Sequence, residues 1–445
     1  MESIAARIAR IRPVRCFGRV TAIRAGLVSV AGLSHHASIG DRVIFPMLGG
    51  RNLGGEIIGL SADHAHILPE SPPDGLSIDA EAELIFAPDL APDSSWVGRI
   101  IDPFGQPLDG RPLKSGPVAR PYHCPPPQAV TRKRLGGRID TGLAVFDTLL
   151  PIVRGQRIGL FAGSGVGKST LLSSLSRGMA ADVVVIAMIG ERGRELREFV
   201  ENTLGPEGMA RAVIVAATSD QSPLLRRRCA WAAMTVAEHF RDQGRHVLFL
   251  ADSITRFAEA HREVALAAGE GASHRGFPPS TSHLIMSLAE RAGPGAEGAG
   301  DITGIFSVLV AGSDMEEPVA DILRGVLDGH VVLDRAIAER GRFPAVDVLR
   351  SVSRSLPHAA SADENALIGR ARAALGAYAE SELMIKAGLY APGSDAKLDE
   401  AVRLYPALDA FVARHSPEGA QDSFAMLAAA LGQRRGVATE LLAKT

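Results

Sequence analysis

The segment that most constrains the fold is a glycine-rich stretch that ends in Gly-Lys-Ser. Residues 160–170 read Leu-Phe-Ala-Gly-Ser-Gly-Val-Gly-Lys-Ser-Thr. An apolar strand, Arg157 to Phe161, is predicted to run into the glycines, and a helix is predicted from Lys168 to Arg177. A phosphate-binding loop requires this order of strand, loop and helix. Ala162 stands where the strictest form of the motif has its first glycine, but Gly-Lys-Ser lies at the right offset, so the segment is predicted to bind a polyphosphate.

The residue types of this loop suit a polyphosphate and Mg²⁺. Its glycines have no side chains, so backbone N–H groups and the positive end of the helix can close around a phosphate. Lys168 is expected to reach the β- and γ-phosphates, and Ser169 to place its hydroxyl on Mg²⁺. The predicted nucleotide-binding residues of the loop are Gly163, Ser164, Gly165, Val166, Gly167, Lys168, Ser169 and Thr170.

Length and composition indicate a multidomain globular protein. The chain has 445 residues, which predicts two or three domains, and 46% of them are apolar. A net charge of -2 gives no overall electrostatic reason to expect a nucleic-acid partner. The three cysteines are far apart, which indicates neither a disulfide framework nor a zinc site and fits a reducing cytosol. Since no apolar run approaches the roughly 18 residues that cross a bilayer, and the start of the chain lacks a signal-peptide core, we expect a soluble protein that can still dock on a membrane.

The first part of the chain is predicted to be a small β domain. From Phe17 to about Leu68, short β-type runs are separated by glycines, which predicts a small all-β barrel or sandwich. Leu68 to Gly75 is interpreted as a linker, because its prolines and glycine cannot continue a strand ladder. We therefore predict an N-terminal domain over residues 1–75.

The remainder is predicted to be an α/β domain over residues 76–355 and a helical domain over residues 356–445. Between Ile139 and about Ser355, apolar strands alternate with helical patterns, as in a parallel sheet covered on both faces. The predicted strands are Arg157 to Phe161, Val183 to Ile189, Val213 to Ala217, Val247 to Ala251 and Ile305 to Val310. Beyond Pro357 the chain is rich in alanine and leucine, which favours helix.

Two patterns in the N-terminal part of the sequence need an interpretation. Ile4, Ile8 and Ile11 share one face of a predicted helix that also carries arginines. That helix is expected either to bind a partner or an anionic membrane, or to pack on the barrel as a short lead-in. Four histidines at 35, 36, 64 and 66 are interpreted as surface residues, because no cysteine or acidic cluster accompanies them.

Two further strand ends carry candidate catalytic groups. The strand that begins at Val247 ends in Asp252, which we expect to hold Mg²⁺ through water rather than to act only as a cap. Arg256, four residues later, is expected either to reach the γ-phosphate or to be a solvated charge. Glu191 follows another apolar strand, where it can orient the attacking water or satisfy the dipole of the next helix, and its own sequence leaves these two roles equal.

A long ordered series of motifs runs through the chain: Ala162 to Thr170, Gly190 to Arg194, Ala251 to Phe257, Phe277 to Ser280, Glu317 to Asp321, Asp328 to Arg335 and Phe343 to Asp347. Together these motifs resemble the rotary ATP synthase superfamily, and within it the flagellum-specific export ATPases of the type III secretion branch. The resemblance extends from about Gly18 to about Arg414, and Gly388 to Ser394 resembles the export branch rather than the synthase. It implies a RecA-like P-loop ATPase core between a small N-terminal β-barrel and a C-terminal helical domain.

The resemblance also implies roles for single residues. Glu191 matches the catalytic glutamate, where non-catalytic subunits of the superfamily have glutamine, and this decides between its two roles in favour of hydrolysis. Arg192 and Arg256 match γ-phosphate contacts, and Phe343 matches the aromatic residue that packs on adenine. Arg354 matches an arginine finger that reaches the active site of a neighbouring subunit.

A finger given to a neighbour implies a homomeric ring, expected to be a hexamer. The resemblance further implies stalk and regulatory subunits, export substrates and chaperones as partners, and peripheral docking to a membrane export gate from the cytoplasmic side of the inner membrane. Two segments, within residues 269–280 and 292–300, are interpreted as mobile loops on the rim or in the lumen of the ring.

Two alternatives differ from flagellar export. An injectisome ATPase of a virulence or symbiosis system would have the same chemistry and other cargo. A ring-shaped RNA translocase would need single-strand-binding aromatic residues on the barrel. Phe17 and Phe45 are the only aromatic residues in the barrel region, so the RNA translocase is disfavoured.

Overall fold

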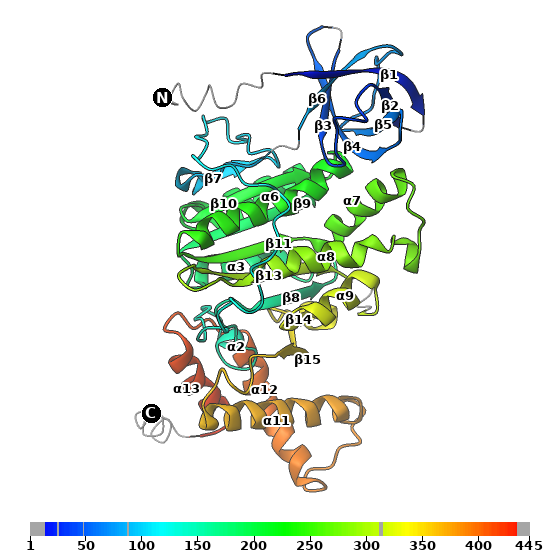
Figure 1. The fold of residues 1–445 in the computed structure, drawn as a ribbon. Helices are drawn as coiled ribbons and strands as arrows, with labels where there is room; N and C mark the ends of the chain where they lie inside the picture. The colour runs from blue at the N-terminus through cyan, green and yellow to red at the C-terminus, as the bar shows by residue number, and fades with distance from the viewer. Residues whose placement is uncertain (1–13, 25, 48, 87–88, 311–314, 434–445) are drawn as a thin grey trace.

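The computed structural model describes residues 14–433 apart from 25, 48, 87–88 and 311–314. Three parts follow one another along the molecule: a β-barrel at one end, a sheet covered by helices in the middle, and a group of helices at the other end (Figure 1). This arrangement confirms the predicted fold class. The predicted N-terminal helix, residues 1–11, lies outside the described residues.

The N-terminal part is a closed six-stranded barrel in the order β1-β2-β5-β4-β3-β6. Its strands are β1 (Cys16–Arg24), β2 (Leu27–Ala31), β3 (Arg42–Pro46), β4 (Asn52–Leu60), β5 (His64–Pro69) and β6 (Glu81–Ile85). Alternate residues such as Val28, Val30 and Ile67 are fully buried inside it, as the period of two along a strand requires.

The expected domain boundary at residue 75 is wrong. Strand β6 lies beyond it and closes the barrel by pairing with both β1 and β3. Pro72, Pro73 and Gly75 therefore lie in the loop that connects barrel strands β5 and β6, and not in a linker between domains. The loop ends a strand as predicted, but the chain then returns to the same sheet, and local turn residues do not encode that return.

The middle part is a sheet in the order β15-β14-β8-β13-β11-β9-β10-β7, with β12 paired to β13. Its strands are β7 (Arg99–Ile101), β8 (Arg157–Ala162), β9 (Val183–Glu191), β10 (Ala212–Thr218), β11 (His246–Asp252), β12 (Gly293–Pro294), β13 (Asp301–Leu309), β14 (Gly329–Leu333) and β15 (Val346–Ser353). All neighbours from β14 to β7 are parallel, and β15 is antiparallel to β14. The five predicted strands are confirmed, whereas β7, β12, β14 and β15 were not predicted.

Helices cover both faces of this sheet (Figure 1). They are α2 (Ala144–Asp147), α3 (Lys168–Gly178), α4 (Gly193–Glu198), a π-helical turn (Phe199–Leu204), α5 (Gly205–Met209), α6 (Pro223–Asp242), α7 (Ile254–Ala267), α8 (Ser280–Arg291), α9 (Pro318–Val326) and α10 (Arg335–Glu339), with short 3₁₀ turns at Ser94–Trp96 and His274–Gly276. Successive residues of β9 enter opposite cores: Val184 and Ile186 pack with α3, and Val183 and Val185 pack with α6. Both faces of the sheet are therefore buried, which holds the strand ends in fixed positions.

The C-terminal part contains α11 (Ala362–Lys386), α12 (Ala396–Val412) and α13 (Ala420–Ala430). Helix α11 begins with a capping box in which Ser361 and Glu364 bond each other's backbone N–H groups. Leu404 and Phe411 of α12 lie in the same hydrophobic core as helix α3 of the middle part. The helical C-terminal region was thus predicted correctly, and it shares a core with the α/β domain.

Part of the segment 292–300 is a strand rather than the expected loop. Gly293 and Pro294 form β12, and Gly300 lies so close to the carbonyl group of Arg245 that no side chain would fit. This segment adjoins the start of β13, at the opposite end of the strands from the phosphate-binding loop. Its small residues permit close backbone packing, which composition alone does not distinguish from mobility.

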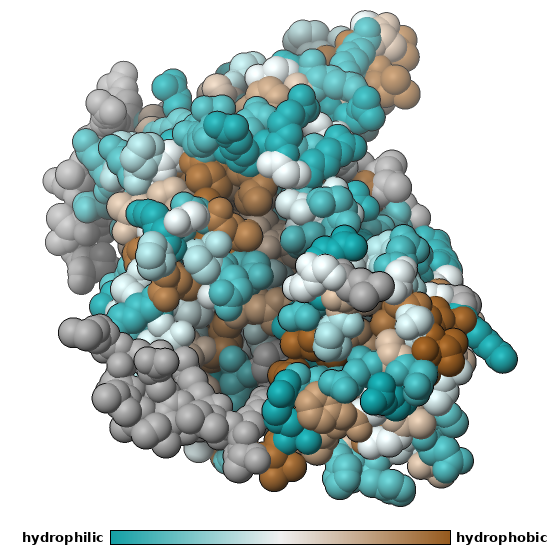
Figure 2. Space-filling view, turned by 90° about the horizontal axis from the view of Figure 1, so that it is seen from above, coloured by the Kyte–Doolittle hydropathy of each residue, from teal (hydrophilic) through white to brown (hydrophobic). Residues whose placement is uncertain are grey.

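Figure 2 shows the molecule from the barrel end. The surface on this side is mostly hydrophilic, and its hydrophobic residues lie in separate patches. Among the described residues, none of the helices combines the length and the apolar character needed to span a bilayer.

Candidate active site

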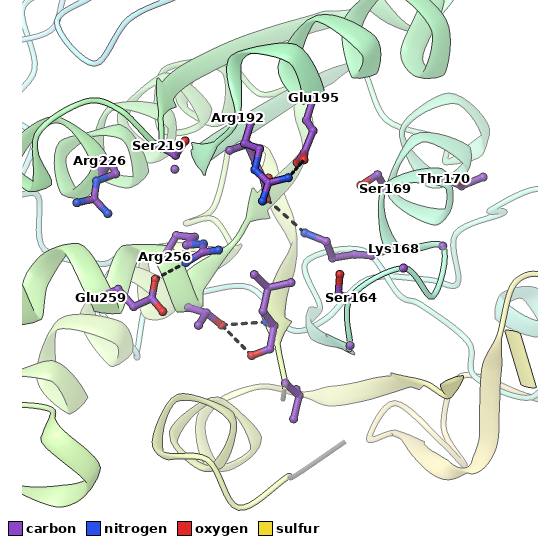
Figure 3. Close-up of a pocket in the computed structure, with 18 of the residues that line it drawn as sticks. Ser164, Lys168, Ser169, Thr170, Arg192, Glu195, Ser219, Arg226, Arg256 and Glu259 are labelled. Atoms are coloured by element: carbon purple, nitrogen blue, oxygen red, sulfur yellow. Dashed lines mark hydrogen bonds and ion pairs between the residues drawn. The ribbon is translucent and has the colours of Figure 1, made fainter. Parts of the chain in front are cut away.

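The phosphate-binding loop lies at the carboxyl end of β8 and opens a pocket of about 950 Å³ (Figure 3). Gly165 and Gly167 have φ angles of 77° and 88°, a conformation that favours glycine, and helix α3 begins directly after Gly167. The loop residues that line the pocket are Gly163, Ser164, Gly165, Gly167, Lys168, Ser169 and Thr170. Val166, which was also expected to bind nucleotide, is 2% exposed and packs in the hydrophobic core, so its side chain is not part of the pocket.

Lys168 is paired with two carboxylates. Its ammonium contacts the carboxylate of Asp252, and Nζ lies 3.7 Å from Oε1 of Glu191. Asp252 ends β11, is 2% exposed and also accepts a hydrogen bond of 2.8 Å from Oγ of Ser307 on β13. The strands β8, β11 and β9, with β13 between β8 and β11, therefore bring one cation and two acids together at the same edge of the sheet.

Glu191 is the carboxyl group with the most perturbed environment in this pocket. Burial raises its pKa, and the charge of Asp252 raises it further, whereas Lys168 lowers it, so that the pKa lies at about 7. A carboxyl group that titrates near neutral pH can accept a proton from water and still be ionised under working conditions. The position of Glu191 thus suits a general base.

Two arginines of the pocket are held by carboxylates three residues further along the chain (Figure 3). Arg192 Nη1 lies 3.2 Å from Oε1 of Glu195, and Arg256 Nη1 lies 2.8 Å from Oε2 of Glu259. The hydrogen bond to Glu259 also raises the pKa of Arg256. These side chains line the pocket, so they can exchange a carboxylate for the oxygens of a bound phosphate.

Several pocket residues were not predicted from the sequence. They are Glu195, Ser219, Arg226, Thr255, Glu259, Leu309, Val310 and Glu317. Ser219 and Val310 follow directly on the carboxyl ends of β10 and β13, so the rule that ligands bind at this edge of a parallel sheet would have found them. Arg226 and Glu259 lie on α6 and α7, and only the packing of these helices places them here.

The oxygen donors present fit Mg²⁺ that is bound together with a polyphosphate. Mg²⁺ prefers oxygen ligands and usually keeps waters and substrate phosphates in its shell. Ser169 offers a hydroxyl group in the pocket, and Asp252 offers a carboxylate behind Lys168. Within the described part of the chain, no group of three or more histidine, cysteine or acidic residues could hold a metal ion unaided. The phosphates would therefore have to complete the metal site.

Phe343 and Arg354 lie outside the pocket lining. Phe343 is 52% exposed, and its ring lies against the phosphate-binding loop, where a Cβ atom on Gly167 would be 3.2 Å from Cδ1 of the ring. Arg354 follows β15, is exposed, and donates a hydrogen bond of 3.1 Å to the carbonyl group of Arg324. The ring is thus close enough to meet a nucleotide in the same chain, whereas Arg354 does not line this pocket.

The chain matches known proteins over nearly its whole length. Residues 142–353 match the nucleotide-binding domain of the ATP synthase alpha/beta family, and residues 360–429 match the T3SS EscN ATPase C-terminal domain. The flagellum-specific ATP synthase of Caulobacter vibrioides is 45% identical over 96% of this chain and 98% of the relative. The flagellum-specific ATP synthase of Salmonella typhimurium is 38% identical over 93% of this chain and 92% of the relative.

A solved structure has the same fold. The assembled ATPase EscN from the type III secretion system of enteropathogenic E. coli superposes with a TM-score of 0.85 at 33% identity, covering 93% of this chain and 100% of that chain. These matches, together with the phosphate-binding loop and the acids around Lys168, identify the family and the activity. The chain belongs to the ATP synthase alpha/beta family, in its branch of flagellum-specific and type III secretion ATPases, and is an ATP hydrolase.

Proposed function

We propose that this ATPase hydrolyses Mg-ATP at the pocket of Lys168 and thereby drives the delivery or unfolding of flagellar export substrates at a membrane gate. The observation that carries the proposal is the position of Glu191, a carboxyl group at the end of β9 that faces the lysine of the phosphate-binding loop at 3.7 Å. A family member that only binds nucleotide would not need a base there.

Each pocket residue has a role in this proposal. The loop from Gly163 to Thr170 binds the phosphates, with Lys168 on the β- and γ-phosphates. The hydroxyl group of Ser169 and, through water, Asp252 would hold Mg²⁺, which would supply positive charge against the phosphates. Glu191 takes a proton from the attacking water, and Arg192 and Arg256 bind the γ-phosphate after they leave Glu195 and Glu259. Phe343 packs on the adenine ring.

A homohexameric ring would complete the site. Arg354 is exposed directly after β15, the edge strand of the sheet, and would reach the active site of the next subunit as an arginine finger. The relative EscN has been solved as an assembled ATPase, and also in complex with its central stalk EscO, which supports a ring and a stalk partner here.

The remaining partners follow from the same family membership. They are regulatory subunits, export substrates and their chaperones, with the ring in the cytoplasm and docked peripherally at the export gate of the inner membrane. Nucleic acid is not among them. Of the two aromatic residues in the barrel, Phe45 is fully buried and Phe17 lies 4.9 Å from the guanidinium of Arg15, so the barrel offers no row of exposed rings for single-stranded RNA.

Complementation in the source bacterium tests the proposal. Deleting the gene should abolish motility and the secretion of flagellar subunits. The native gene should restore both, whereas Glu191→Gln should restore neither at equal protein level. Intact flagella with loss of secreted effector proteins would instead assign the chain to an injectisome, and normal secretion of both classes would contradict an export function.

A further inference from the structure

Arg342, next to Phe343, anchors the loop that carries this ring. The loop connects α10 to β15, and the side chain of Arg342 is 11% exposed. Its Nη2 donates a hydrogen bond of 2.8 Å to the carbonyl group of Val346, and its Nη1 donates one of 3.3 Å to that of Pro344. One guanidinium therefore fixes the backbone on the carboxyl side of Phe343.

The same guanidinium is tied to the C-terminal helical domain. Its Nε lies 2.9 Å from Oδ1 of Asp409, in the last turn of helix α12, as an ion pair without hydrogen-bond geometry. A buried cation needs a carboxylate partner, and Asp409 provides one. Arg340, at the end of α10, makes a second link to this domain, because its Nη1 lies 3.3 Å from Oε1 of Glu382 on α11.

These ion pairs surround a cavity of about 270 Å³ between α10, β15, α11 and α12. The rings of Tyr378 and Tyr405 stack in its wall, with centroids 3.6 Å apart and an angle of 9° between their planes. The link from Arg342 to Asp409 is thus part of the junction between the two domains, with the arginine buried and the aspartate partly exposed.

We propose that Asp409 is a positioning residue for the nucleotide base. Through Arg342 it holds the backbone of Phe343 so that the ring stays against Gly167 of the phosphate-binding loop. Helix α12 then contributes to the affinity for the base, although none of its residues lines the pocket of Lys168. This inference rests on the proposed role of Phe343 on adenine.

Without the ion pair to Asp409, Arg342 should hold the backbone beside Phe343 less firmly. The ring should then spend less time in its position against Gly167. Phe343 is 52% exposed, so few neighbours besides the loop backbone fix its position. An aromatic stack that forms in only part of the molecules weakens binding by about fivefold. The proposed phosphate contacts come from the loop between β8 and α3 and from Arg192 and Arg256, none of which belongs to the segment between α10 and β15, so they should be unchanged.

The test compares ATP with a ligand that lacks a base. In Asp409→Asn, we expect the KM for ATP to rise about fivefold, kcat to stay within about twofold, and the preference for ATP over GTP to fall. The inhibition constant of inorganic tripolyphosphate against ATP hydrolysis should not change. Glu400→Gln is the matched control, because Glu400 lies on the same helix and pairs with Arg370 at the exposed surface.

A second variant separates positioning from folding. Arg342→Gln should reproduce the selective loss of ATP affinity, and the double variant should be no worse than either single one. Equal weakening of ATP and tripolyphosphate would indicate a merely structural role and overturn the inference, as would kinetics equal to those of Glu400→Gln. Failure of the proposed function is distinct, because then the native enzyme itself would not hydrolyse ATP.

Discussion

The ammonium of Lys168 lies 3.7 Å from the carboxylate of Glu191 and contacts the buried carboxylate of Asp252 as well. One positive charge thus faces two negative ones, on three side chains that are each largely buried. The attraction of Lys168 lowers the pKa of Glu191, but burial and the repulsion from Asp252 outweigh it. The result is a carboxyl group whose protonation changes at about neutral pH, and this property leads to the first two predictions.

The first prediction concerns the pH dependence of hydrolysis. Glu191 must be ionised to accept a proton from water, and its pKa lies at about 7. We therefore expect kcat/KM, which reports the free enzyme, to fall by about tenfold per unit as pH decreases below about 7, and to level off above it. Steady-state rates in a buffer series of constant ionic strength would measure this. A flat profile down to pH of about 5.5 would contradict the role of Glu191 as the base.

The second prediction is that Glu191→Gln stabilises the free protein. The folded-state pKa of about 7 lies above the ordinary value of 4.5, so the native state favours the protonated carboxyl group. Its contribution to stability is full below the ordinary value and is lost as pH rises through about 7. At about pH 8 the ionised group then costs about 1–3 kcal/mol, which glutamine avoids.

Thermal unfolding at two pH values checks this sign. We expect Glu191→Gln to raise the Tm by several degrees at about pH 8 and by much less at about pH 5. Glu201→Gln, which changes an exposed carboxylate paired with Arg197, serves as control and should leave the Tm unchanged at both pH values. A lower Tm of Glu191→Gln at high pH would mean that the pairing with Lys168 stabilises the ionised form.

The third prediction concerns a site shared between subunits. Arg354→Ala should lower kcat by about a thousandfold, since a finger stabilises charge on the transferred phosphoryl group. Mixing Arg354→Ala with Glu191→Gln should restore part of the activity, because some interfaces then combine an intact glutamate with an intact arginine. Arg335→Ala, which removes an exposed arginine of α10, is the control and should be fully active. Mixed rings without any recovery would exclude a finger provided by a neighbour.

The fourth prediction concerns the junction between the barrel and the α/β domain. Glu56 on β4 is 7% exposed and accepts hydrogen bonds from Arg227, at 2.6 Å, and from Arg228. Glu56→Gln would leave two buried cations with reduced compensation and should cost about 3–5 kcal/mol. Denaturant unfolding followed by tryptophan fluorescence measures this. Glu339→Gln, at an exposed ion pair, should unfold like the native chain, and the same result for Glu56→Gln would contradict the proposed importance of this junction.

The sequence predicted the parts of the site that follow directly on strands. Lys168, Glu191 and Asp252 each follow or end an apolar strand, and parallel strands bring their carboxyl ends to one edge. Phe343 and Arg354 have no such local pattern, so they were predicted only from the resemblance to a family. The contact of Lys168 with Asp252 and the link of Arg342 to Asp409 depend on packing between distant segments, which local periodicity does not encode.

In the fold as well, local sequence patterns were sufficient to predict some elements and not others. The five buried strands were predicted because continuous apolar runs mark strands covered on both faces. The short strand β7 and the edge strand β15, which alternates buried and exposed residues, have weaker patterns and were missed. Strand β6 was assigned to the wrong side of a domain boundary, because the prolines before it mark a turn without indicating which sheet the chain rejoins.

The most direct test of the proposed mechanism compares the Mg-ATPase activity of the native chain with that of Glu191→Gln. We predict that both bind ATP in the presence of Mg²⁺ with similar affinity, and that only the native chain releases phosphate over many turnovers. Specific activity should rise with protein concentration as subunits associate. Phosphate release by Glu191→Gln at a rate close to that of the native chain would contradict the central claim that Glu191 activates the attacking water.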